Sequence, residues 1–80
     1  YEAAHFWYLC AARQGHARAQ FNLGVMYAAG QGAPRDLVEA YAWLHRAGGA
    51  GIGPARDYLA RTARRMDAQQ LSQAESLLHA

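Results

Sequence analysis

The sequence predicts an all-α fold, a right-handed solenoid of antiparallel helix pairs with about five helices. When the 80-residue chain is shifted by 36 positions it matches itself, with Trp7 falling on Trp43 and Leu23 on Leu59. A fixed period of this length is typical of stacked helical repeats. Alanine, leucine, arginine and glutamine dominate and β-branched residues are scarce, which favours helices throughout. No alternating strand pattern appears.

The first two expected helices cover residues 1–14 and 17–29. Apolar side chains recur at helical spacing on one face of the first, at Ala4, Trp7, Tyr8, Ala11 and Ala12. Gly15 suits the position just past a helix end, where φ is usually positive. Gly24 lies inside the second helix, where glycine costs about 1 kcal/mol relative to alanine. It therefore predicts the close approach of a neighbouring helix.

A capping box predicts where the third helix begins. Asp36 suits the N-cap position, and Glu39 lies three residues further on. The helix is expected over 37–47 and is followed by several glycines that predict its end. Its inward residues are expected to be Ala40, Trp43, Leu44 and Ala47.

The last two helices are expected over 54–65 and from Asp67 onward. Pro54 suits the first turn of the former, because its fixed φ fits the helix and its missing N–H is not needed there. Asp67 and Gln70 form a second capping box. The apolar face of the final helix is expected to be Leu71, Ala74, Leu77 and Leu78.

A longer spacing pattern runs through the first two thirds of the chain. It is carried by Trp7, Ala11, Ala12, Gly15, Ala19, Leu23, Gly24, Tyr27, Gly30, Gly32, Ala33, Asp36 and Ala40, and it restarts at Trp43. These residues resemble one full unit of the Sel-one-like repeat family, whose members are related to the tetratricopeptide repeats. The resemblance fades beyond about residue 53, where Ala60 and Ala63 replace the glycine and the tyrosine of the pattern.

The resemblance implies a single repeat domain with four parts. Residues 1–15 would be the second helix of a preceding repeat, and 16–51 one complete repeat. Residues 52–65 would be a degenerate repeat helix, and 66–80 a C-terminal capping helix that covers the last apolar face. We expect further repeats upstream in a longer parent protein. We also expect an open N-terminal edge at Phe6, Trp7 and Tyr8 that mediates self-association.

The chain offers no residue pattern typical of catalysis, metal binding or cofactor binding. Cys10 is the only cysteine, which excludes an internal disulfide, and it is expected to be a small buried thiol. His5 and His45 have no ligand residue at metal-binding spacing and are expected at the surface or at helix caps. His16 follows Gly15 at a helix start, where local capping or turn geometry would explain it. The segment Gly30–Gly32 lacks the ending of a phosphate-binding loop.

Charge and hydropathy argue against two classes of partner. A net charge of +2 is too small to predict nucleic-acid binding. No apolar run approaches the roughly 20 residues that a membrane-spanning helix needs. All basic residues are arginines, and alanine and glycine are abundant, which is typical of a bacterial source with GC-rich codons. A periplasmic and a cytoplasmic location both stay open.

The resemblance implies a binding surface, because the first helix of each unit lines the concave face in repeats of this kind. The residues that would face a partner are Arg18, Phe21, Asn22, Val25, Asp57 and Arg61. Asn22 would hydrogen-bond a peptide backbone, and Arg61 would pair with a carboxylate. Phe21 and Asn22 also fit packing positions of the family, so both roles stay open.

Arginines cluster at 56, 61, 64 and 65, and two interpretations of the cluster stay open. Asp57 precedes Arg61 by four residues, which fits an intrahelical ion pair. Arg64 and Arg65 fall in the last turn, where cations interact favourably with the helix dipole. A solvated helix end explains these features. An acidic or phosphate-bearing partner is the alternative.

Taken together, these observations predict a protein–protein interaction module, an adaptor or scaffold that binds a peptide or protein partner on its concave surface. One alternative is a regulatory or inhibitory module attached to an enzyme or a membrane signalling domain. A hydrolase is a more remote alternative, because the cysteine-paired repeats of the family members linked to β-lactam hydrolysis are absent here. We expect no catalytic residue, no metal ligand and no cofactor.

Overall fold

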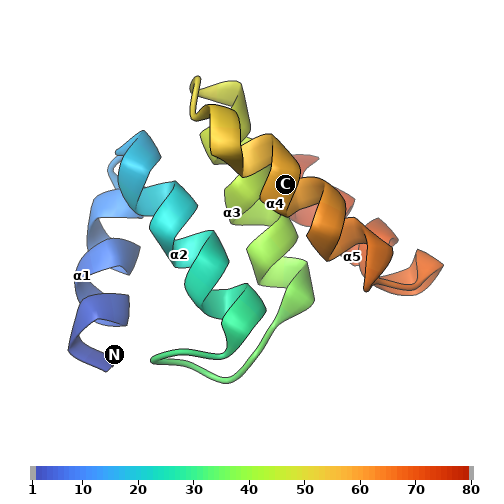
Figure 1. Ribbon diagram of the computed structural model, residues 1–80, viewed down its shortest axis with the longest axis horizontal. Helices are drawn as coiled ribbons and strands as arrows, with labels where there is room; N and C mark the ends of the chain where they lie inside the picture. Colours follow the sequence, from blue (N-terminus) through green and yellow to red (C-terminus); the bar gives the residue numbers. More distant parts are fainter. Residues whose placement is uncertain (1, 80) are drawn as a thin grey trace.

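Five α-helices make up most of the chain (Figure 1). The structure is a computed structural model and describes residues 2–79. The helices are α1 (Glu2–Arg13), α2 (Ala17–Ala29), α3 (Leu37–Gly49), α4 (Gly53–Arg64) and α5 (Ala68–His79). No strand occurs within the described range, so the all-α prediction is confirmed.

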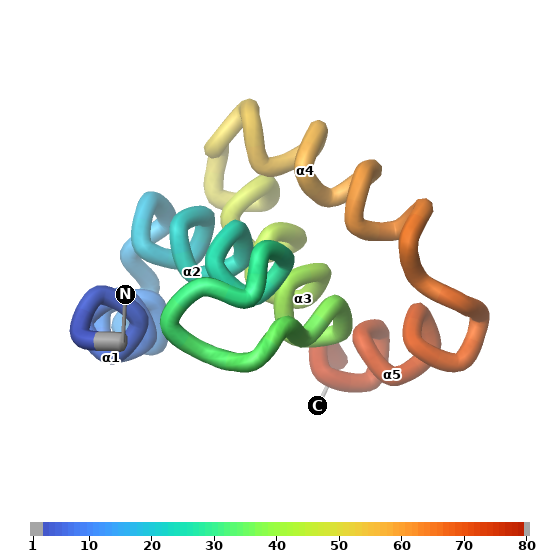
Figure 2. The backbone as a smooth tube through the Cα atoms, turned by 60° about the horizontal axis from the view of Figure 1, so that its bottom comes forward, coloured from blue at the N-terminus to red at the C-terminus, as the bar shows by residue number. Residues whose placement is uncertain are grey.

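Helix α3 lies at the centre of the arrangement. α2 packs against α1 on one side and α3 on the other, and α4 continues beyond α3. α5 turns back and packs mainly on α3 (Figure 2). Because α2, α4 and α5 all contact α3, each of its predicted inward residues is buried, namely Ala40, Trp43, Leu44 and Ala47.

Two apolar clusters form the core, one on each side of α2. The first joins α1, α2 and α3 through Ala12, Ala19, Leu23 and Trp43. The second joins α3 and α4 through Leu44, Ala47 and Ala55, and half-buried side chains of α2 pack against it. α2 thus contributes residues to both clusters, and its position determines how α3 and α4 lie relative to α1.

The predicted close approach at Gly24 is confirmed at the contact between α2 and α3. A Cβ atom on Gly24 would lie 2.7 Å from Leu44 Cγ and 3.2 Å from the Leu44 backbone nitrogen. Both distances are shorter than an ordinary van der Waals contact. Leu44 is fully buried, so the absence of a side chain at Gly24 lets the two helices touch here.

The predicted capping boxes are confirmed in full at one helix start and in part at another. The Asp36 carboxylate accepts a hydrogen bond from the Glu39 backbone N–H at 3.1 Å, but the Asp36 N–H donates to the Tyr27 carbonyl oxygen rather than to Glu39. Asp67 and Gln70 form a reciprocal capping box with bonds of 2.8 and 3.0 Å. His16 occupies the N-cap of α2, but its side chain makes no capping bond, so of the two expected roles only turn geometry remains.

One expectation about α1 is wrong, because no described helix covers the outer side of α1. Cys10, expected to be buried, is exposed. Trp7, expected at the open edge, is 72% exposed, and Phe6 beside it is 63% exposed. Tyr8, also expected at that edge, packs against the core together with Leu9. The exposure of Phe6 and Trp7 agrees with an open N-terminal edge, and self-association through it stays a prediction.

Helix α4 departs from the repeat geometry. Ala60 occupies the position of Gly24 one period later, and it is exposed. The equivalent position in α2 is covered by α3, whereas α5 makes its main contact with α3 rather than with α4. The close helix contact of the full repeat is therefore not repeated at Ala60, which agrees with the loss of glycine there.

The α1–α2 contact contains a perturbed tyrosine. The ring of His5, expected at the surface, is half-buried and meets the Tyr27 ring edge-on with 5.1 Å between centroids. Burial is the largest cause that raises the pKa of Tyr27 above its ordinary value of 10.0. The carboxylates of Glu39 and Asp36 act in the same direction, and Arg13 opposes them. The folded state therefore favours the neutral phenol.

We predict that Gly24→Ala destabilises the protein. Overpacking a core costs about 1–3 kcal/mol, and the gain in helix propensity is only about 1 kcal/mol, so unfolding free energy should fall by up to about 2 kcal/mol. Gly49→Ala is the matched control, because nothing lies within 4 Å of a Cβ there. It should leave stability unchanged or raise it by up to about 1 kcal/mol. Urea unfolding followed by circular dichroism measures the unfolding free energy of both variants. If Gly24→Ala were as stable as Gly49→Ala, the close contact would be contradicted.

A second prediction concerns alkaline pH. Because the folded pKa of Tyr27 is raised, its contribution to stability is fully present below about pH 10 and is lost as pH rises through the folded pKa. The unfolding free energy of the native protein should therefore fall more steeply above pH 10 than that of Tyr27→Phe. Denaturant titrations between pH 8 and about pH 11 test this, and parallel curves would rule it out.

Candidate functional site

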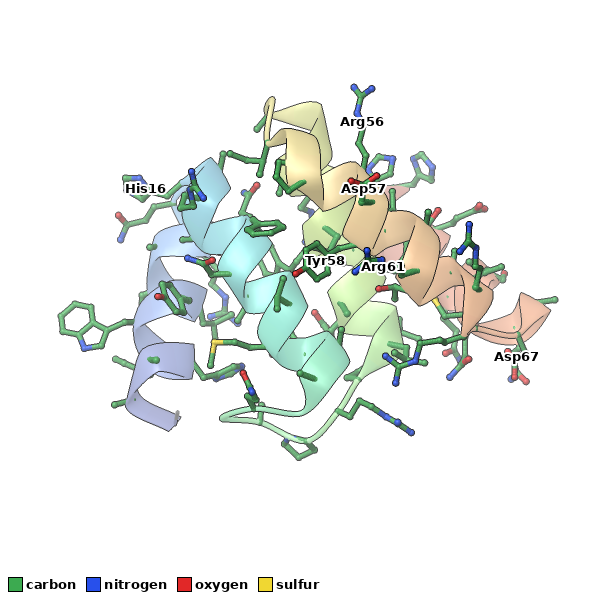
Figure 3. The ribbon with its side chains drawn as sticks, viewed as in Figure 1. His16, Arg56, Asp57, Tyr58, Arg61 and Asp67 are labelled. Carbon is green, nitrogen blue, oxygen red and sulfur yellow. The ribbon has the colours of Figure 1, made fainter. Side chains whose placement is uncertain are left out.

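The main surface feature is a groove between α2 and α4, formed by two adjoining hollows. The basic end, of about 210 Å³, is lined by Val25, Ala28, Ala29, Tyr58, Arg61, Thr62 and Arg65. The amide end, of about 300 Å³, is lined by Ala4, Tyr8, Phe21, Asn22, Val25, Met26, Gln31 and Tyr58. Val25 and Tyr58 line both ends and so make them one α2–α4 groove. Figure 3 shows Tyr58 between the two helices.

Aromatic rings and a guanidinium follow one another along this groove. The rings of Phe21 on α2 and Tyr58 on α4 meet edge-on, with centroids 5.4 Å apart and an interplanar angle of 76°. The guanidinium carbon of Arg61 lies 5.5 Å from the centroid of the Tyr58 ring. Edge-on aromatic pairs and cation–π contacts each contribute about 0.5–1.5 kcal/mol. We call these three side chains the aromatic–guanidinium row.

The position of Arg61 corrects one sequence-based expectation. Spacing on the helix favoured an ion pair between Asp57 and Arg61, but the structure has no such pair, and Arg61 lies against Tyr58 instead. Asp57 is exposed and does not line the groove. An exposed ion pair of this spacing contributes only about 0.3–0.5 kcal/mol. A cation–π contact between Arg61 and the Tyr58 ring contributes at least as much.

The end of α4 is tied to the end of α2 beside the basic end. Arg65 donates a long hydrogen bond of 3.4 Å to the Ala28 carbonyl oxygen. The Thr62 hydroxyl donates to the Tyr58 carbonyl oxygen at 2.8 Å. The lining of the basic end is otherwise largely apolar, and its charged groups are the two arginines at its border.

The structure brings four of the six predicted site residues together. Phe21, Asn22 and Val25 line the amide end, and Arg61 borders the basic end. Arg18 and Asp57 are exposed and line neither hollow, so their assignment to the binding surface is not supported.

Sequence reasoning missed the residue at the centre of the groove. Tyr58 lines both ends and belongs to the aromatic–guanidinium row. The 36-residue period could have indicated it, because a shift of 36 positions places Tyr58 on Asn22, a predicted site residue, and Arg61 on Val25. The same period places Arg65 on Ala29, which also lines the basic end.

Two other hollows are larger but offer less to a partner. One of about 330 Å³ includes Arg46, which lies 4.8 Å from the Trp43 ring and also donates to the Leu77 carbonyl oxygen at 3.2 Å. Its guanidinium is thus already engaged. The other, of about 390 Å³, has Leu59 as its only large apolar side chain. Binding sites are usually apolar hollows with a few convergent polar groups, which fits the α2–α4 groove better.

Two features are absent from the described part of the chain, a metal-binding cluster and a membrane-spanning helix. No group of three or more His, Cys, Asp or Glu residues between 2 and 79 is placed to hold a metal ion. Within the same range, no helix is long and apolar enough to cross a lipid bilayer.

The edge-on contact between Phe21 and Tyr58 should be measurable as an energetic coupling. In a double-mutant cycle with Phe21→Leu and Tyr58→Leu, we expect a coupling of about 0.5–1.5 kcal/mol in unfolding free energy. Tyr58→Phe serves as a control that keeps the ring, so a cycle of Phe21→Leu with Tyr58→Phe should give a coupling close to zero. Additive effects of the two leucine variants, within about 0.3 kcal/mol, would contradict the contact.

Comparison with known families agrees with this architecture. A family model described as Sel1 repeat matches residues 1–16 and 17–52, which is more than half of the chain. No curated protein matches the chain significantly. Sel1 repeats are helical and generally mediate protein–protein interaction, and proteins that contain them are typically non-enzymatic adaptors. The chain belongs to the Sel1 repeat family.

Proposed function

We propose that this chain is a protein-interaction module and that the α2–α4 groove is the surface that binds its peptide or protein partner. One observation carries the proposal. The aromatic–guanidinium row lies along an apolar groove, and its members are only partly covered by the rest of the chain. Aromatic residues and arginine are the residue types that contribute most to binding at protein interfaces.

The amide end adds the polar groups that a bound peptide needs. Asn22 and Gln31 border it, and no side-chain hydrogen bond within residues 3–79 uses either amide. A peptide backbone has one donor and one acceptor per residue, which must be satisfied when water is removed. Free amides beside an apolar floor therefore favour an extended peptide over a purely apolar ligand.

The membership of a family of interaction modules supports the same conclusion. A groove between the first helices of two successive units uses both units, because α2 and α4 lie one period apart. The proposed surface therefore depends on the repeat arrangement itself rather than on one isolated helix.

Site-specific photo-cross-linking tests the proposal. With benzoylphenylalanine at position 29, an exposed site at the basic end, the protein should form a cross-link to its partner in the cells that produce it. Position 56 is the matched control, because Arg56 is exposed on α4 and points away from the groove in Figure 3. We expect a cross-link from position 29 and none from position 56.

The cross-link should also depend on Tyr58. Truncating a central aromatic residue commonly costs 2 kcal/mol or more, so Tyr58→Ala should lower the yield at subsaturating partner by at least about tenfold. Circular dichroism confirms that the variant keeps its helices. Equal cross-linking from positions 29 and 56, or a yield that does not change with Tyr58→Ala, would refute the groove as the binding surface.

A further inference from the structure

The positive charge of the chain is concentrated beside the α2–α4 groove. Residues 53–65 contain four arginines and one aspartate, a net charge of +3, whereas the whole chain carries +2. The remaining 67 residues therefore carry a net charge of −1. The charge is localised on one helix and its end, and the groove runs along that helix.

Two of the four arginines border the basic end, and both keep unused hydrogen-bond donors. The Arg61 guanidinium lies against the Tyr58 ring, and Arg65 makes one long bond to a backbone carbonyl. A guanidinium has five N–H donors in a planar fork that fits a carboxylate. No ion pair joins either arginine to a carboxylate within residues 3–79. The two side chains are thus free to receive an anionic group from outside the chain.

We propose that the α2–α4 groove binds an acidic peptide segment in which an apolar side chain neighbours a carboxylate. This inference rests on the function proposed above and specifies the chemistry of the partner. The apolar side chain packs on Val25 and Tyr58, whose hollow of about 210 Å³ accommodates a leucine or phenylalanine. The neighbouring carboxylate reaches Arg61 and Arg65, which border the same hollow.

The same features argue against a nucleic acid as the occupant. Outside 53–65 the chain is slightly acidic, so no extended basic track continues along the surface. Single-stranded nucleic acids bind on several aromatic platforms that lie along a charged groove. Here the basic end has one ring, that of Tyr58, and one face of this ring is already occupied by Arg61.

Selection from a random dodecapeptide library tests the inference on the purified chain. We expect enrichment of sequences in which Asp or Glu lies next to Leu, Ile, Phe or Met. The best acidic peptide should then bind Arg61→Glu/Arg65→Glu at least about tenfold more weakly, because two charge-assisted contacts are lost and reversed. Affinity for the native protein should also fall as salt rises from about 50 to 500 mM.

Arg56→Glu/Arg64→Glu is the matched control. It makes the same change in net charge on the same helix, at exposed positions that do not line the groove. It should weaken binding less than about threefold, since only long-range attraction is reduced. Equal losses in the two double variants would overturn the inference, because attraction would then be non-specific.

The remaining outcomes separate this inference from the proposed function. Enriched peptides that lack carboxylates but lose affinity with Tyr58→Ala would overturn the acidic partner and leave groove binding intact. If no peptide is enriched, and single-stranded RNA binds the native protein but not Arg61→Glu/Arg65→Glu, both proposals are wrong. If no peptide is enriched and RNA does not bind either, the peptide-binding groove itself is refuted.

Discussion

The contact between Gly24 and Leu44 is the constraint on which the rest of the structure depends. The missing side chain at Gly24 brings α3 against the backbone of α2, and Leu44 is fully buried as a result. This contact fixes the rotation of α2, since Leu23 then belongs to the first apolar cluster and Val25 faces the second. The same rotation places Phe21 and Val25 along the groove. One small residue thus links core packing to the candidate site.

The groove results from the way the repeat pattern ends. α4 packs on α3 through Ala55 and Leu59, whereas it meets α2 through the Phe21–Tyr58 ring contact and the bond from Arg65, just past its end, to Ala28. In the full unit, α3 closes on α2 at a glycine, but Ala60 replaces this glycine in α4 and remains exposed. α5 then packs on α3. The inner side of α4 is therefore left to face α2 across an open groove.

Local signals in the sequence predicted most of the fold. The capping residues Asp36 and Asp67 determine helix starts through bonds to residues three positions away, so they can be recognised without knowledge of tertiary structure. Cys10 was assigned wrongly, because helical spacing gives a residue's face but not whether another helix covers it. Tyr58 was missed although the period contained it, since its role depends on the angle at which α4 crosses α3.

The aromatic–guanidinium row shows how a groove can keep a charged group available for a partner. Arg61 has two neighbours within reach, the Asp57 carboxylate four residues earlier and the Tyr58 ring three residues earlier. An ion pair with Asp57 would neutralise the guanidinium on the exposed side of α4, whereas the ring holds it beside the hollow with its charge uncompensated. The ion pair would contribute about 0.3–0.5 kcal/mol and the cation–π contact about 0.5–1 kcal/mol, and Phe21 packs edge-on against Tyr58 and so supports the ring that Arg61 contacts. α2 therefore helps to position a cation on α4, and the proposed binding at the basic end would depend on a contact between two helices that lie one period apart.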